Sequence, residues 1–87
     1  MVVLWRQTEA DRARRAGFTV SRQVRGAVAR NRVKRRLRAA YRETREAAPA
    51  RVSLVVIGRP SLLRAPMTTV TGDMRVALRN IPGERSG

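Results

Sequence analysis

The sequence lacks two residue types altogether, because its 87 residues include no cysteine and no histidine. Without cysteine, the chain has no disulfide framework and no zinc site of the kinds that use thiolates. Without histidine, imidazole metal ligation and histidine-based acid–base catalysis are excluded as well. No serine or threonine therefore has a histidine base that could activate it as a nucleophile.

Acidic residues are also scarce, with six Asp and Glu side chains in the whole sequence. Four of them are scattered along the chain, and the other two, Glu43 and Glu46, fall within a predicted helix. They show no pairing pattern that would suggest a glycosidase or a two-metal nuclease. We therefore predict no catalytic residue and no protein metal site in this chain.

Long apolar runs are missing too. The longest, Met1–Trp5 and Leu54–Ile57, are far shorter than the roughly 20 residues that a transmembrane helix needs. The N-terminal run has no basic region before it and no small-residue cleavage site after it, in contrast to a signal peptide. We expect a cytoplasmic protein.

Positive charge is what the sequence has in excess. Twenty basic residues, nineteen of them arginine, give a formal net charge of +14. Such an excess repels itself in a compact chain unless a polyanion neutralises it. Arginine offers a planar fork to phosphate and a flat face to bases. Nucleic acid is therefore the first candidate partner, and an anionic membrane is the second.

Two N-terminal segments have the pattern of β-strands. Val2–Arg6 is β-branched and aromatic, and Gly17–Arg22 alternates, with Phe18 and Val20 on one face. The polar residues between the two segments are typical of a connection. We expect the two strands to pair as a hairpin with a long loop.

A long helix is predicted from Ala27 to about Ala48, after the break at Gly26 and before Pro49. A narrow apolar stripe recurs along it at helical spacing, and consists of Ala29, Val33, Leu37, Ala40 and Thr44, widened by Tyr41. We expect this stripe to face the core.

Two further elements complete the predicted fold. Val52–Gly58 is expected to be a buried strand because both its faces are largely apolar. Pro66–Ile81 is predicted to be an amphipathic helix with Thr68 or Thr69 as its N-cap. The order of elements indicates an α/β (two-layer α+β) domain, with a small sheet of three to four strands packed with the long basic helix and the C-terminal helix. We expect one domain over residues 1–87, with residues 83–87 as a disordered tail.

The most informative segment runs from Arg30 to Arg38, where six of nine residues are cationic. On a helix, Arg30, Lys34 and Arg38 fall in one row beside the apolar stripe, and Asn31 and Arg35 fall in the adjoining row. Like charges four residues apart destabilise a helix by roughly 0.2–0.5 kcal/mol per pair. This face therefore opposes helix stability unless an anion lies against it, and it predicts an RNA-binding surface.

Three other interpretations of this helix are weaker. A solvated surface normally mixes charges of both signs, whereas no acid stands between Asp11 and Glu43. A basic-region helix in the DNA major groove needs a dimerising heptad afterwards, and Pro49 ends the helix too early. A membrane-surface helix needs a broad apolar face, and this stripe is narrow and made largely of small residues.

Trp5 admits two interpretations. As one of three aromatic residues in the chain, it could belong to the core. A flat ring on a sheet flanked by cations could equally form a stacking platform for unpaired nucleotides. The sequence leaves both open, whereas Phe18 and Tyr41 are predicted core residues.

The segment from Gly26 to Arg38, GAVARNRVKRRLR, resembles the signature helix of the ribonuclease P protein family. The preceding Gly17–Arg22 and the later segment Val55–Pro60 resemble the flanking strands of that family, in the right order and spacing. The resemblance covers nearly the whole chain. It implies a ribonuclease P protein-like fold.

The resemblance also implies a function, namely an accessory subunit of a catalytic RNA that removes 5′ leaders from precursor tRNA. The protein would supply binding and positioning, while magnesium ions held mainly by the partner RNA perform the hydrolysis. The implied partners are the ribonuclease P RNA subunit and precursor tRNA, with no membrane and no DNA. The expected RNA-binding residues are Arg22, Arg30, Asn31, Arg32, Lys34, Arg35 and Arg38.

Trp5 would take the place of a strand aromatic lining the leader cleft on the open face of the sheet. The alternative is a non-catalytic protein that binds structured RNA, such as a ribosomal protein.

Three departures from the family pattern stand out. The family normally begins with a helix before the first strand, whereas Met1 here precedes the strand directly, so we expect that helix to be lacking. Glycine is common where Arg25 stands, and Gly26 follows one place later. Ala39 occupies a position often filled by an acid or an amide.

Overall fold

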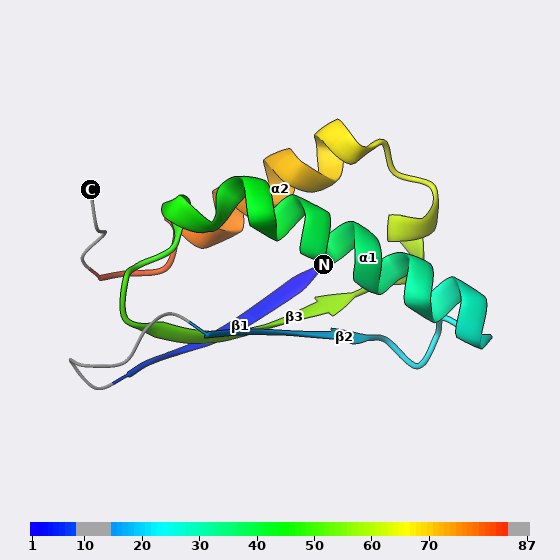
Figure 1. Cartoon of the computed structure of the whole chain (residues 1–87), viewed down its shortest axis with the longest axis horizontal. Coiled ribbons are helices and arrows are strands. Elements are labelled where there is room, and N and C mark those ends of the chain that lie inside the picture. Colours follow the sequence, from blue (N-terminus) through cyan, green and yellow to red (C-terminus); the bar gives the residue numbers. More distant parts are fainter. Residues whose placement is uncertain (9–14, 84–87) are drawn as a thin grey trace.

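A three-stranded sheet carries two α-helices on one of its faces (Figure 1). The structure is a computed structural model, and it describes residues 1–8 and 15–83. Its elements, in chain order, are β1 (Val2–Gln7), β2 (Arg15–Val20), α1 (Ala27–Thr44), the 3₁₀ turn η1 (Arg45–Ala47), β3 (Val52–Gly58), the 3₁₀ turn η2 (Pro60–Leu63) and α2 (Met67–Arg79). This arrangement confirms the predicted two-layer fold with a small sheet, a long basic helix and a C-terminal helix.

The strand order is β1-β3-β2, so the predicted β1–β2 hairpin is wrong. β1 pairs antiparallel with β3, and β2 pairs parallel with β3 on the other side. The central position suits β3 because it is the most apolar strand, and its neighbours shield both of its edges. The strands with charged residues, Arg6 on β1 and Arg15 on β2, take the edges, where such residues discourage pairing with other chains.

The two faces of the sheet differ in burial. Along β3, Val52, Leu54 and Val56 are buried under the helices, whereas Val55 on the opposite face is 41% exposed. The prediction that both faces of this strand are buried is therefore wrong. The helices α1 and α2 both lie on the same side (Figure 1), and no described element covers the other face.

The strand β2 begins and ends two residues earlier than predicted. Its alternation is confirmed, because Phe18 and Val20 face the helices while Gly17 and Thr19 face the opposite side. The strand ends where Ser21 donates its backbone N–H to the carbonyl of Gly58 at 2.8 Å and the chain turns toward α1. Phe18 then meets Tyr41 of α1 edge to face, with ring centroids 5.6 Å apart, which confirms both as packed against the core.

The helix α1 buries most of the predicted stripe, while Ala29 and Tyr41 are partly buried. Val33, Leu37, Ala40 and Thr44 are buried, and the hydroxyl of Thr44 donates to the carbonyl of Ala40 at 2.8 Å. This bond satisfies the one polar group on an otherwise apolar face. The last predicted turn, up to Ala47, is 3₁₀ rather than α.

The helix α2 packs against α1 through Val70, Met74 and Leu78. Its N-cap is Pro66, so the prediction of Thr68 or Thr69 as the cap is wrong. Pro66 has an extended ψ and its carbonyl accepts the N–H groups of Thr69 and Val70. Because proline has no N–H to satisfy and a fixed φ, it enters a helix here without a side-chain cap.

Two predictions fall partly outside the described residues. The connection between the first two strands includes residues 9–14, and the predicted disordered tail includes residues 84–87. Within the described ranges, no helix is long and apolar enough to cross a membrane.

Candidate nucleic-acid interface

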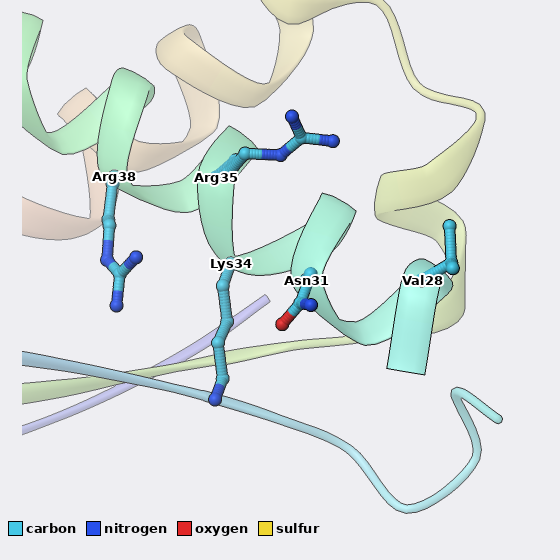
Figure 2. A pocket seen from close by; sticks show the side chains of 5 residues that line it. All are labelled: Val28, Asn31, Lys34, Arg35 and Arg38. Atoms are coloured by element: carbon cyan, nitrogen blue, oxygen red, sulfur yellow. The ribbon is translucent and has the colours of Figure 1, made fainter. Parts of the chain in front are cut away.

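One face of α1 gathers the polar and cationic residues of the basic run around a shallow hollow. Its lining consists of Val28, Asn31, Lys34, Arg35 and Arg38 (Figure 2), and we call this surface the cationic face. Lys34 and Arg38 extend from α1 in the same direction, and Arg35 extends sideways from them. The surface therefore offers charged groups over a broad angle around the helix.

The cationic face follows from helical spacing. Residue 31 lies three and four positions before residues 34 and 35, which lie four and three positions before residue 38. This spacing places all four on one side of an α-helix. The first turn of α1 contains no acid, and the lining of the hollow contains no carboxylate. Positive charge is therefore left uncompensated within the cationic face, which favours a bound polyanion.

Arg30 has a different position from the one expected. Its guanidinium donates three hydrogen bonds to backbone carbonyls, to Val20, Ser21 and Val24, each at 3.1 Å. The side chain is partly buried and does not line the hollow of the cationic face. Arg30 thus holds the β2–α1 loop in place, and most of its donors are used within the chain.

The other expected RNA-binding residues lie outside the cationic face. Arg32 is exposed and lines a second hollow, at the start of α1, together with Arg25 and Arg64. Arg22 is exposed on the loop after β2 and lines neither hollow. Arg36 of α1 donates to the carbonyl of Ala65.

Trp5 lies on the face of the sheet that the helices cover. In the antiparallel register it is opposite Leu54, which is buried on that face, and paired residues share a face. Because β1 is an edge strand, the side chain of Trp5 remains 44% exposed. It is therefore no core residue, and it does not lie on the open face where the leader cleft was expected.

The open face of the sheet carries aliphatic residues instead. Leu4, which pairs with Val55, is 55% exposed there, and Gly17 of β2 lies on the other side of Val55. The Cβ that a larger residue at 17 would have lies within 4 Å of Val55. A pair of exposed aliphatic side chains next to a glycine forms a flat apolar strip.

Sequence reasoning missed three residues near α1. Val28 is 83% exposed on the cationic face, and its spacing of three from Asn31 was a signal that could have found it. Arg25 and Arg64 line the second hollow, but Arg64 is far from the helix in sequence. No local pattern could have identified it.

The chain matches known proteins over most of its length. A family model described as Ribonuclease P matches residues 1–82. The ribonuclease P protein component of Paramagnetospirillum magneticum is 43% identical over 68 residues, which cover 77% of this chain and 51% of that protein. The protein of the same name from Gluconacetobacter diazotrophicus is 44% identical over 66 residues, which cover 75% of this chain and 57% of that protein. The chain thus spans just over half the length of these relatives.

The comparison of folds also finds a ribonuclease P protein. The ribonuclease P protein of Thermotoga maritima superposes with a TM-score of 0.79 at 32% identity, over 93% of this chain and 76% of that one. Sequence and fold agree over nearly all of the described residues. The chain therefore belongs to the ribonuclease P protein family.

Proposed function

We propose that this chain acts as the protein subunit of ribonuclease P. It would bind the catalytic RNA and the 5′ leader of precursor tRNA, and assist the endonucleolytic removal of the leader. The observation that carries the proposal is the cationic face of α1, where Lys34, Arg35 and Arg38 share one side of the helix with Asn31. Its membership of the ribonuclease P protein family supports the same assignment.

The cationic face would bind RNA backbone. Lysine and arginine that neutralise phosphates release condensed counterions, which gives affinity without reading sequence. Asn31 adds an amide that can both donate and accept a hydrogen bond. Arg22 and Arg32, both exposed near the start of α1, would extend the contact, while Arg30 would act mainly by holding the loop.

The leader of precursor tRNA is single-stranded, so its bases are free to stack on protein groups. Two surfaces suit it: the apolar strip of Leu4 and Val55 on the open face, and the exposed ring of Trp5 at the edge of β1. We favour Trp5 because base–aromatic stacking is worth about 1–3 kcal/mol per base. Substitutions at Leu4 and Trp5 can determine which side of the sheet binds the leader.

Magnesium would be held mainly by the RNA. Among the described residues, no three side chains of the ligand types His, Cys, Asp and Glu come together. When bound by the RNA, the ion would activate water for phosphodiester hydrolysis, and this chain would contribute binding and positioning.

We infer a cytoplasmic protein that binds neither membrane nor DNA. A second candidate function, binding another structured RNA as a ribosomal protein does, uses the same cationic face. The two differ in whether precursor tRNA is a substrate.

Reconstitution tests the proposal. The purified chain is added to a bacterial ribonuclease P RNA at low magnesium, and removal of the 5′ leader from precursor tRNA is followed. Stimulation by the wild-type chain, lost in a Lys34→Gln/Arg35→Gln/Arg38→Gln variant, would support the assignment. Binding to the RNA without stimulation would favour the second candidate, and absence of both would contradict the proposed function.

A further inference from the structure

A second hollow lies at the start of α1, next to the cationic face. Three arginines from separate parts of the chain line it: Arg25 before α1, Arg32 on α1, and Arg64 after η2. The rest of its lining is apolar and comes from the first turn of α1 and Leu63. We call it the arginine hollow.

The three arginines of this hollow are available to bind a phosphate. All three side chains are exposed, and no carboxylate is among the residues that line the hollow. Three guanidinium groups around one concavity repel each other unless an anion lies between them. Arginine binds phosphate oxygens through paired N–H groups, so a phosphate is the anion that fits this donor set best.

A phosphate alone would not explain the apolar part of the lining. Val28 is 83% exposed although it is β-branched and apolar, and Leu63 is only partly buried beside it. An apolar surface next to arginines suits a planar base, which can pack on aliphatic carbon and on a guanidinium plane. A ligand with both a base and a phosphate is a nucleotide.

The arginine hollow is continuous with the cationic face. Val28 lines both hollows, and it lies on the first turn of α1, at the end of the row away from Arg38 (Figure 2). An RNA strand whose phosphates lie along Lys34 and Arg35 would therefore reach Val28 without leaving the protein surface. The occupant that fits is an unpaired nucleotide of RNA already held by α1.

We propose that the arginine hollow binds one unpaired nucleotide of the RNA that lies on the cationic face. The base packs against Val28 and Leu63, and its phosphates pair with Arg25, Arg32 and Arg64. This inference rests on the proposed function, because the same RNA occupies both surfaces. The cationic face would bind the RNA backbone, and the arginine hollow would add a specific contact to one unpaired nucleotide.

The first test is a salt titration of the whole chain binding to a bacterial ribonuclease P RNA at fixed magnesium. Arg64→Gln should flatten the slope of log K against log salt by about 0.7–0.9, the loss of one phosphate contact. Arg51→Gln is the matched control, because Arg51 is also exposed and lines neither hollow. If Arg64→Gln behaves as Arg51→Gln does, the phosphate contact in the arginine hollow is refuted.

The second test uses the absence of cysteine, which allows one thiol to be placed at will. A Leu63→Cys variant, labelled at a residue that lines only the arginine hollow, should cross-link through a photoreactive benzophenone to a nucleotide that chemical probing shows to be unpaired in the complex. The same label on an Arg35→Cys variant reports RNA on the cationic face. Cross-links from residue 35 without any from residue 63, or cross-links from residue 63 to paired nucleotides only, would refute the arginine hollow alone. Absence of cross-links from both positions would contradict the proposed function as well.

Discussion

Gly58 of β3 lies directly beneath Val33 of α1, so closely that a Cβ atom at residue 58 would overlap Val33 Cγ1. The same Cβ would lie 3.1 Å from a methyl carbon of Leu37 and 3.1 Å from one of Leu62. The strand and the helix can approach this closely only because residue 58 has no side chain. This contact sets the distance between the cationic helix and the sheet.

Gly58→Ala should therefore destabilise the protein. Overpacking a well-packed core costs typically about 1–3 kcal/mol, and all three neighbours of the new methyl are buried side chains. The measurement is the free energy of unfolding from urea denaturation. Gly17→Ala is the matched control, because its Cβ would meet Val55 at 3.9 Å, an ordinary contact. Equal stability of the two variants would contradict the close approach.

Arg30→Ala should lower the free energy of unfolding by more than it changes the free energy of RNA binding. It removes three hydrogen bonds from a partly buried guanidinium, and a hydrogen bond to a charged group contributes about 1.5–3 kcal/mol. Because all three bonds hold the same loop, their contributions do not simply add. We expect a total loss of about 2–3 kcal/mol in the free energy of unfolding. Arg35→Ala, which removes an exposed side chain, should stay within about 0.5 kcal/mol of wild type. The reverse order of the two variants in thermal melts would refute the structural role of Arg30.

The salt dependence of RNA affinity tests whether Arg35 contacts a phosphate. Arg35→Ala is expected to flatten the slope of log K against log salt by about 0.7–0.9 for a lost phosphate contact. Arg35→Lys keeps the charge but loses the paired donors of the guanidinium, so it should keep the slope while weakening affinity. An unchanged slope in Arg35→Ala would exclude this residue from the RNA contact.

Leu4 and Trp5 decide which side of the sheet binds the leader, because neighbouring strand residues point to opposite faces. Trp5→Ser should weaken binding of precursor tRNA to the reconstituted complex by about 1–3 kcal/mol, and leave mature tRNA without a leader unaffected. Leu4→Ser is the matched change on the open face. A leader-specific loss in Leu4→Ser alone would place the leader on the open face instead.

Gly72 offers a stabilising change in α2. A Cβ atom at residue 72 would have no heavy atom within 4 Å, and its φ is not in the left-handed region. Gly72→Ala should therefore raise the free energy of unfolding by about 1 kcal/mol through helix propensity. Gly26→Ala is a useful contrast, because Gly26 has a φ of 88° and an alanine there would be strained. Destabilisation by Gly72→Ala would show that α2 is not a regular helix at this position.

Local pattern was sufficient for the elements and for part of the interface. The period of Val33, Leu37, Ala40 and Thr44 predicts both the helix α1 and its buried side, because helical geometry alone places these residues on one face. The same geometry puts residues 31, 34, 35 and 38 together on a neighbouring side, and no acid in the first turn offsets them. Composition alone, with a net charge of +14, indicated an anionic partner.

Tertiary structure decided the strand order, the partners of Arg30 and the arginine hollow. A hairpin of β1 and β2 satisfies local pattern as well as the observed order does, and only the burial of β3 between two partners distinguishes them. Nothing local tells Arg30, turned inward onto three carbonyls, from Arg35 on the surface. Arg64 comes near Arg25 and Arg32 because η2 folds back beside the start of α1, a contact more than thirty residues apart in sequence. The sequence by itself determined which residues carry charge and on which helix, whereas packing between distant segments decided which of those charges remain free to meet RNA.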